Sequence, residues 1–157
     1  MFSGEFTVAI EGAKQGKFKG EGTHEGSRDK IIGLGFEYEI KSPRDAATGT
    51  ATGKRVHLPM VIMKEWGAAS PQIFQAAVTN ETLKSVVLEF FQSGEGARGS
   101  GASEVFYTIR LTNASIAGVK QSMQQDGRYV EEVSLVFQKI EVEHKGSKTT
   151  SSDEWGK

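Results

Sequence analysis

The chain has 157 residues, which is the size of one domain and enough to bury a core of its own. Its formal net charge is −1 and its basic residues are scattered, so no strong field favours nucleic acid or an anionic membrane as a partner. The absence of cysteine excludes disulfides, thiolate metal sites and a cysteine nucleophile.

Three segments in the first half of the chain have the polarity pattern of strands. Residues 6–12 (FTVAIEG) and 31–40 (IIGLGFEYEI) alternate apolar side chains with polar ones or glycine, which predicts strands with one buried face. Gly33 and Gly35 inside the second segment indicate a bend or a close backbone neighbour. Residues 56–66 (VHLPMVIMKEW) are apolar on both faces, so we expect this strand to be covered on both sides.

A short helix is predicted for residues 70–79, SPQIFQAAVT. Ser70 fits the N-cap, Pro71 fits the first helical position, and Asn80 fits the end. A helix of this length is marginal alone, so we expect its apolar face to dock on a sheet. That face consists of Ile73, Phe74, Ala77 and Val78. With Phe74 buried there, Phe74→Ala is expected to cost about 3–5 kcal/mol.

The second half of the chain contains further strand patterns. Residues 84–92 and 103–111 alternate clearly, and residues 113–123 alternate more weakly. Residues 126–144 begin at an Asp-Gly turn and run long. Roughly seven strands and one helix predict a mainly β, single-domain protein over residues 1–144. We expect a split or closed β-barrel of two sheets with the short helix packed on its side.

The end of the chain carries two further signals. In the last predicted strand the apolar positions change from odd to even numbers after Phe137, which predicts a β-bulge near Gln138 or Lys139. Residues 145–157 form a polar C-terminal tail that we expect to be mobile or to order only against a partner. Trp155 is unusual in such a tail.

Three stretches come close to chemical motifs without meeting their requirements. Residues 47–55 (ATGTATGKR) lack the glycine spacing and the Lys-Ser/Thr pair of a phosphate-binding loop. Residues 94–99 (GEGARG) have the spacing of a dinucleotide fingerprint, but lead from one strand into another instead of opening a helix. His24 and Glu25 begin like H-E-x-x-H, but Arg28 stands where the second histidine is needed. We therefore predict no catalytic residue, no metal site and no cofactor.

Four separated blocks of sequence carry a more specific signal. They are SPRDAATG (42–49), GKR-x-H-x-P (53–59), KEWGAASPQ (64–72) and VSLVFQKIE (133–141). In this order they resemble the haemolysin-coregulated protein (Hcp) family, the tube protein of bacterial type VI secretion. The family implies a β-barrel with one helix, similar to tail-tube proteins of contractile phages, that assembles into six-membered rings. The rings stack into a tube that a contracting sheath drives, tipped by a spike, out of the cell.

The resemblance also implies a role for the long segment 42–57. In the family this segment reaches away from the barrel and contacts neighbouring subunits, which fits its length, polarity and Thr/Ala/Gly content. The residues expected at the subunit interface are Ser42, Pro43, Arg44, Asp45, Gly53, Lys54, Arg55 and His57. We expect the four charged residues among them to form ion pairs across subunits.

The partners implied by the resemblance are further copies of the chain in a homo-hexamer and in stacked rings, the contractile sheath, the spike and baseplate proteins, and small effector proteins in the lumen. Nucleic acid and membrane insertion are not expected. The first residues, MFSGEFTVAIEG, lack the basic and apolar regions of a signal peptide, and no segment approaches the roughly 18 apolar residues of a membrane span. We expect a protein of the bacterial cytoplasm that is exported without a cleaved signal peptide to the extracellular space or a target cell.

Two other classes of function remain open to the sequence. An enzyme would need a nucleophile or metal constellation, and the adjacent Glu131 and Glu132 are better interpreted as solvated edge charge than as a catalytic pair. A monomeric β-barrel for a small ligand would keep a deep apolar pocket and would present no large self-complementary surface.

Overall fold

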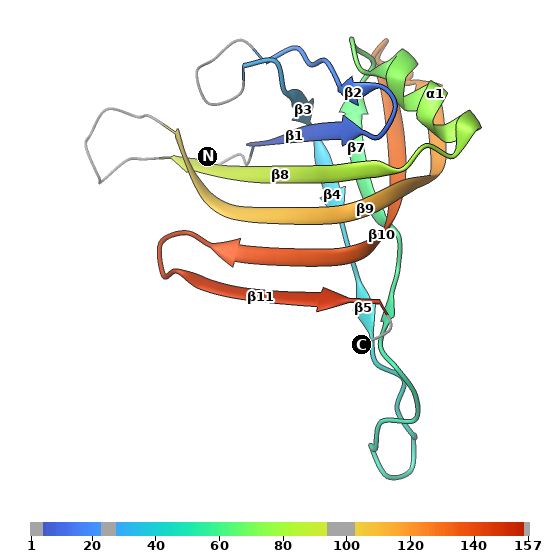
Figure 1. Cartoon of the computed structure of the whole chain (residues 1–157), viewed down its shortest axis with the longest axis vertical. Helices are drawn as coiled ribbons and strands as arrows, with labels where there is room; N and C mark the ends of the chain where they lie inside the picture. The colour runs from blue at the N-terminus through green and yellow to red at the C-terminus, as the bar shows by residue number, and fades with distance from the viewer. Residues whose placement is uncertain (1–4, 23–27, 94–102, 156–157) are drawn as a thin grey trace.

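Eleven strands and one helix, α1 (Ser70–Thr79), are found in the computed structural model, which describes residues 5–22, 28–93 and 103–155 (Figure 1). The strands are β1 (Glu5–Gly12), β2 (Gly16–Lys17), β3 (Ile31–Gly33), β4 (Gly35–Glu37), β5 (Ile40–Lys41), β6 (Val56–His57), β7 (Met60–Glu65), β8 (Leu83–Ser93), β9 (Ser103–Met123), β10 (Tyr129–His144) and β11 (Thr149–Glu154). The helix has the bounds that the sequence predicts. Within the described residues no helix combines the length and the apolar character needed to cross a membrane.

Nine of the strands form one strongly curved sheet. Its order is β2-β1-β8-β9-β10-β7-β4, with β3 paired to β1 and β11 paired to β10. β3 and β4 follow each other directly, yet β3 pairs with β1 near one end of this order and β4 pairs with β7 at the other. This interrupted strand brings the two ends of the sheet together without a continuous hydrogen-bonded closure (Figure 1). The predicted mainly β, split-barrel fold with one short helix is therefore confirmed.

The junction between β3 and β4 depends on Gly33. A Cβ at this position would lie 2.1 Å from a ring carbon of Phe6, so a larger residue fits only if that ring moves. Beyond the junction, the amide of Leu34 donates to the carbonyl of Met63 (2.7 Å), which begins the pairing with β7. Of the two alternatives predicted from the glycines of this segment, the bend is found, at Leu34 between β3 and β4, while the close neighbour of Gly33 is a side chain and not a backbone.

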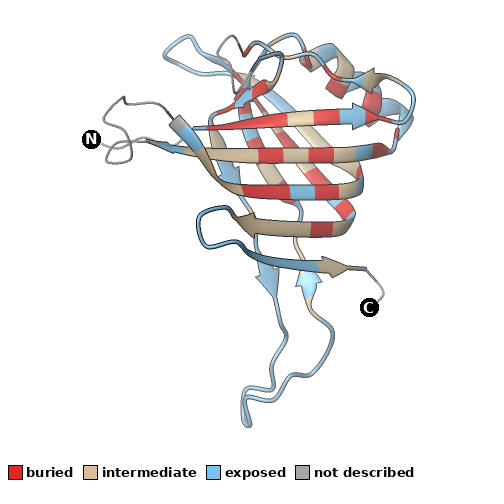
Figure 2. Cartoon of the chain, turned by 60° about the vertical axis from the view of Figure 1, so that its left-hand side comes forward, coloured by how far each residue is buried: buried red, intermediate tan, exposed pale blue. Residues whose placement is uncertain are grey.

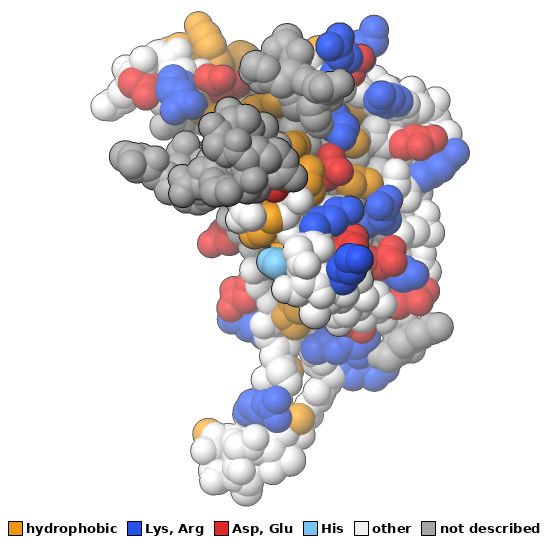
Figure 3. All heavy atoms as spheres, turned by 90° about the vertical axis from the view of Figure 1, so that its left-hand side faces the viewer, with side chains coloured by type: hydrophobic (Ala, Val, Ile, Leu, Met, Phe, Trp, Pro, Cys, Tyr) orange, Lys and Arg blue, Asp and Glu red, His pale blue; other side chains and the backbone are white. Residues whose placement is uncertain are grey.

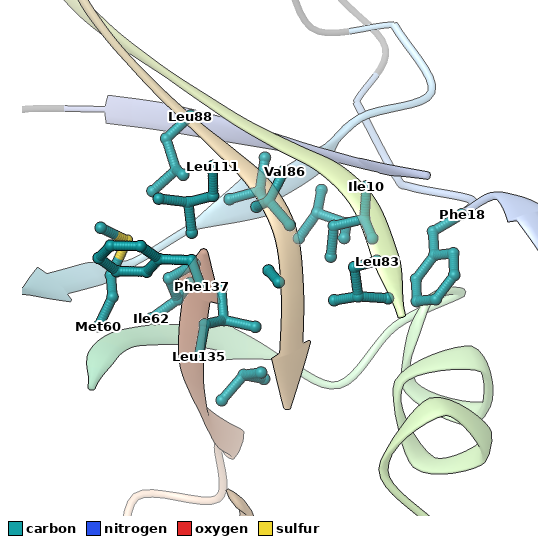
Figure 4. Close-up of a cluster of buried hydrophobic side chains, with 14 of the residues drawn as sticks. Ile10, Phe18, Met60, Ile62, Leu83, Val86, Leu88, Leu111, Leu135 and Phe137 are labelled. Atoms are coloured by element: carbon teal, nitrogen blue, oxygen red, sulfur yellow. The ribbon is translucent and has the colours of Figure 1, made fainter. Parts of the chain in front are cut away.

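Apolar side chains from facing strands fill the interior of the barrel. Burial alternates along β10 with a period close to two, and Figure 2 shows the same alternation along the neighbouring strands. The largest fully buried apolar side chains are Ile31, Met60, Ile73, Leu83, Leu88, Leu111 and Leu135. Figure 4 shows part of this cluster, with Phe18 on one side and Phe137 on the other. The cavity lined by Val8 and Leu135 measures about 10 Å³, whereas small-ligand pockets measure roughly 300–1,000 Å³.

The second half of the barrel differs from the prediction in two places. The two segments predicted between residues 103 and 123 form a single strand, β9, in which Asn113 has a left-handed φ of 51°. Asn113 donates to the side chain of Gln138 on β10 (2.8 Å). At this point the buried positions change between odd and even residue numbers on both strands, although the register between β9 and β10 does not shift. The left-handed residue turns the strand, so no extra residue is needed. The register shift lies beside Ser134, and the position predicted for the bulge, at Gln138 or Lys139, is wrong.

α1 packs on the barrel by a different face from the one predicted. Ile73 and Ala76 are buried, whereas Phe74 is 62% exposed and Val78 is also exposed. Successive helical residues point about 100° apart, so with Ile73 and Ala76 against the sheet the ring of Phe74 points to solvent. The predicted burial of Phe74, and the stability loss expected from it, are therefore wrong.

Both ends of α1 are fixed by specific residues. At the C-terminus, Asn80 takes a left-handed conformation with φ 56°, as expected for the residue that ends the helix. At the N-terminus, Ala69 occupies the cap position in place of Ser70. The hydroxyl of Ser70 is engaged elsewhere, since it accepts from the amide of Gly67 (2.9 Å) and donates to Glu131 (2.9 Å).

Glu131 and Lys64 form a buried ion pair next to the start of α1. Their side chains are 0% and 2% exposed and lie 2.6 Å apart. The second oxygen of Glu131 accepts from Gln121 (2.9 Å), and Lys64 also donates to the carbonyl of Glu65 (2.7 Å). The interpretation of Glu131 as solvated edge charge is therefore wrong. Its carboxylate is on the inward face of β10, the same face as Val133.

The outer face of β7 is open in the single chain. Met60 and Ile62 are buried in the barrel, while Met63 is exposed and Val61 is half-buried. The prediction that this strand is covered on both sides is wrong for a single copy.

The polar tail is ordered by the chain itself. Residues 149–154 form β11, which pairs antiparallel with the end of β10 from Lys139↔Glu154 to His144↔Thr149. The expectation of a mobile tail is wrong for these residues, because backbone pairing orders a strand whatever the polarity of its side chains. β11 lies directly above the base of the projecting loop (Figure 1).

Candidate assembly interface

Residues 42–57, called the assembly loop from here on, project away from the barrel. Figure 1 shows the loop extending beyond β5 and β6, and Figure 3 shows a narrow projection made mainly of uncharged surface. Every residue from 42 to 54 is exposed. The stem of the loop is a two-stranded ribbon in which Ile40 pairs with His57 and Lys41 with Val56.

The tip of the assembly loop is ordered by its own hydrogen bonds. The carboxylate of Asp45 accepts from the amides of Ala47 (2.7 Å) and Thr48 (3.1 Å), and the amide of Asp45 donates to the carbonyl of Thr50 (2.7 Å). Gly49 supplies the left-handed residue of this turn with φ 76°. The glycine-rich stretch is therefore a compact hairpin tip, and Asp45 shapes its turn.

A polar cluster holds the base of the loop. Arg55 donates to both oxygens of Asp153 (2.7 and 2.6 Å) and to the carbonyl of Glu154 (3.0 Å). Nε2 of His57 lies 2.7 Å from the same carboxylate, and Nδ1 lies 2.5 Å from the hydroxyl of Tyr38. One neutral tautomer of His57 satisfies both bonds by donating to Asp153 and accepting from Tyr38. We call Tyr38, Arg55, His57 and Asp153 the loop-base cluster.

The pKa values of two groups in the loop-base cluster are shifted, that of Asp153 by hydrogen bonds and that of Tyr38 by burial. Hydrogen bonds from Arg55 and then from His57 hold the pKa of Asp153 well below its usual range. Burial, assisted by the negative charge of Asp153, raises the pKa of Tyr38 to about 12. The ring of His57, only 6% exposed, is flanked by Phe137 and Trp155, whose ring centroids are 5.4 and 6.1 Å away.

The order Tyr-His-Asp in this cluster is that of a proton relay, but the contacts of these groups indicate a structural role. The hydroxyl of Tyr38 lies 2.5 Å from Nδ1 of His57, and its pKa is raised to about 12. The carboxylate of Asp153 is bound on both oxygens by Arg55 and His57. The described residues contain no group of three or more His, Asp or Glu side chains suited to a metal ion.

The residues predicted for the interface divide into two groups. Arg55 and His57 lie in the loop-base cluster, and Asp45 shapes the tip. The others are exposed along the loop: Ser42, Pro43, Arg44, Gly53 and Lys54. Among the described residues Arg44 and Lys54 form no ion pair, so they are the charges left for a neighbouring copy. Contact of this loop with a neighbour remains a prediction.

Sequence reasoning missed Tyr38 and Asp153. Asp153 stands 98 positions from Arg55, and nothing in the local sequence connects the two. The available signal was Trp155, an aromatic residue in a polar tail, because such a residue indicates packing against another part of the protein.

The arrangement of barrel, helix and projecting loop is shared with known proteins. The family described as "Type VI secretion system effector, Hcp" matches residues 8–144. The chain belongs to the Hcp family. A "Major exported protein" of Pseudomonas aeruginosa is 32% identical over 164 residues, which cover 94% of this chain and 93% of that protein.

Solved Hcp structures have the same fold. A crystal structure of an Hcp protein matches with a TM-score of 0.88 at 28% identity, covering 96% of this chain and 99% of that one. The secreted protein Hcp3 of Pseudomonas aeruginosa matches with a TM-score of 0.81 at 29% identity, covering 99% of this chain and all (100%) of that one. Hcp is a tube protein of type VI secretion that forms ring assemblies, and it is a structural component, not an enzyme. The family resemblance and the absence of an enzymatic role are thus confirmed.

Proposed function

We propose that this Hcp protein assembles into hexameric rings that stack into the inner tube of a type VI secretion system. The tube is expelled by sheath contraction, with a spike at its tip and a baseplate beneath it, and small effectors travel in its lumen. We propose that the protein leaves the bacterial cytoplasm for the extracellular space or a target cell. Family membership and the exported relative support this proposal.

The geometry of the assembly loop is the observation that carries the proposal. A loop with every residue from 42 to 54 exposed gains nothing from the core of its own chain, yet its tip and base are ordered. Ordering its backbone costs about 1–2 kcal/mol per residue. The contacts of a neighbouring copy offset this cost in a ring or between rings. The open outer face of β7, with Met63 exposed, is a second surface that a neighbour would cover.

Native mass tests the proposal directly. Light scattering or native mass spectrometry is expected to give six times the 17.0 kDa mass of the chain, and multiples of that mass where rings stack. A strict monomer at high protein concentration would contradict the proposal and return the monomeric ligand barrel as the alternative. That alternative is already disfavoured by the packed barrel interior.

The free charges of the loop allow a sharper test. Replacing Arg44 and Lys54 with alanine is expected to weaken rings or stacks while leaving the circular dichroism of the barrel unchanged. The matched control is the double alanine variant of Lys17 and Lys19, which removes the same charge from exposed positions outside the loop. Exposed ion pairs contribute only about 0–1 kcal/mol each, so the double variant is preferred to either single change.

A further inference from the structure

The stem of the assembly loop is too slight to set its own direction. Beyond the Ile40↔His57 and Lys41↔Val56 pairs, the amide of Leu58 donates to the carbonyl of Glu39 (3.0 Å) on the barrel side. On the tip side the amide of Thr52 donates to the carbonyl of Pro43 (3.0 Å), next to the Arg44↔Ala51 bridge. A two-stranded ribbon without a second layer is marginally stable in water. The side chains of Ile40 and Val56 are exposed, so His57 is the ribbon residue whose side chain packs against the barrel, with its ring 5.4 Å from that of Phe137.

β11 supplies the missing support, mainly through the carboxylate of Asp153 and also through the carbonyl of Glu154, which accepts from Arg55 (3.0 Å). Asp153 binds Arg55, which precedes β6, and His57, which ends β6. His57 in turn binds Tyr38, which lies two residues before β5. Both strands of the ribbon are thereby held to β11 and, through β11, to the barrel wall at β10.

We propose that Asp153 is a positioning residue for the assembly loop, and that β11 acts as a lock that sets the direction in which the loop leaves the barrel. Ring or stack formation then depends on a residue that lies outside the loop. The dependence of assembly rests on the function proposed above, whereas the ordering of the loop by Asp153 does not.

Two features distinguish this lock from an ordinary surface ion pair. Asp153 makes three side-chain bonds with two residues of the loop, and two of them form a bidentate pair with a guanidinium, the stronger kind of charge-assisted contact. His57 is almost fully buried although it belongs to a loop, and both of its ring nitrogens are engaged. An ion pair without a positioning role would need neither the bidentate contact nor the buried histidine.

The test compares Asp153→Asn with a matched control, Glu89→Gln. Glu89 pairs with Lys30 on the barrel at 2.7 Å, with side chains 26% and 30% exposed, against 32% and 30% for Asp153 and Arg55. Trypsin cleavage after Arg44, Lys54 or Arg55 is followed by mass spectrometry at a concentration where all variants have the same native mass. We expect cleavage in Asp153→Asn to be about tenfold faster than in the parent, since the charged grip on Arg55 is lost. We expect Glu89→Gln to match the parent.

Assembly of the same variants is measured separately, over a series of higher protein concentrations, by native mass and by electron microscopy of stacks. We expect fewer rings or stacks for Asp153→Asn and no change for Glu89→Gln. Loop cleavage and assembly equal to those of the parent would overturn the proposal. A parent that stays monomeric would overturn the ring-forming function, and the cleavage measurement would still decide whether Asp153 positions the loop.

A second variant covers the case in which Asp153→Asn fails to fold. Arg55→Lys keeps the positive charge and the trypsin site, but a lysine cannot make the bidentate pair with Asp153. We expect the same acceleration of loop cleavage with an unchanged circular dichroism spectrum. A cleavage rate equal to that of the parent would overturn the proposal in this variant as well.

Discussion

Two ion pairs of this protein have the same length and opposite surroundings. Lys64 and Glu131 meet at 2.6 Å in the barrel, where their side chains are 2% and 0% exposed. Arg55 and Asp153 meet at 2.6 Å below the assembly loop, where about a third of each side chain is exposed. Each pair joins distant parts of the sequence, separated by 67 and 98 positions. Because water can replace a lost partner only in the outer pair, we infer that the inner pair secures the fold and the outer pair secures the geometry of assembly.

The largest effect is expected at the inner pair. Glu131→Ala leaves the ammonium of Lys64 buried without its partner, so the free energy of unfolding is expected to fall by about 3–5 kcal/mol. Urea denaturation at fixed protein concentration measures it. The control is Glu11→Ala, which breaks the exposed pair with Lys84 (3.9 Å) and is expected to cost less than about 1 kcal/mol. Equal stability of the two variants would mean that burial does not set the inner pair apart from an exposed ion pair.

The second prediction tests which face of α1 packs on the barrel, next to the inner pair. Ile73→Ala is expected to lower the free energy of unfolding by about 2–5 kcal/mol, because it empties a fully buried site. Phe74→Ala, one residue further and exposed, is expected to change it by no more than about 0.5 kcal/mol. Thermal or urea denaturation of the two variants side by side measures the contrast. A larger loss for Phe74→Ala would mean that α1 docks by the other face.

The third prediction concerns the effect of low pH on the outer pair. The pKa of Asp153 is lowered in the folded protein, so its stabilisation is complete above the ordinary carboxyl pKa of 3.8 and is lost as the pH falls below it. Hydrogen exchange at the amide of Leu58 in the loop stem, relative to its intrinsic rate, is expected to rise below about pH 4. Amides in the barrel, such as that of Ile109, are expected to stay protected. The same rise in Asp153→Asn would show that another group is responsible.

The smallest effect is expected from the phenol of Tyr38. Burial, and then the charge of Asp153, raise its pKa from 10.0 to about 12 in the folded protein. The neutral phenol therefore stabilises the folded state fully up to about pH 10, and this contribution is lost between pH 10 and about 12. Titration of phenolate absorbance is expected to show a step near pH 12 that is missing in Tyr38→Phe. A step near pH 12 that persists in Tyr38→Phe would place the shifted phenol elsewhere.

Local pattern predicted much of the barrel. The alternation of apolar residues placed β1, β8 and β10 on the right faces, and the bounds of α1 agree with the prediction, since periodicity and end residues are local signals. The buried face of α1 was not decided by spacing, because Ile73, Phe74 and Val78 distribute apolar surface around most of the helix. The neighbouring sheet and the contact of Ser70 with Glu131 orient it.

The inner pair was open to prediction and the outer one was not. Glu131 has the same parity as Val133 and Leu135 in β10, so strict alternation already placed it inside the barrel. Because Glu131 is charged, it was interpreted instead as exposed to solvent. For Asp153 no pattern of this kind exists, since its partners are on a separate ribbon and are brought to it only by the pairing of β11 with β10.

The separation of 98 positions between Arg55 and Asp153 also sets an order of events during folding. β9 and β10 are joined by a short turn, in which the amide of Gln124 donates to the carbonyl of Arg128 (2.7 Å), and they can pair early through local contacts. The contact between Arg55 and Asp153 closes a far longer loop of chain, whose entropy loss must be offset by structure already formed. The lock therefore closes only after β10 and β11 are in place. If rings form as proposed, we expect the undirected assembly loop of a partly folded copy to keep that copy out of a growing ring.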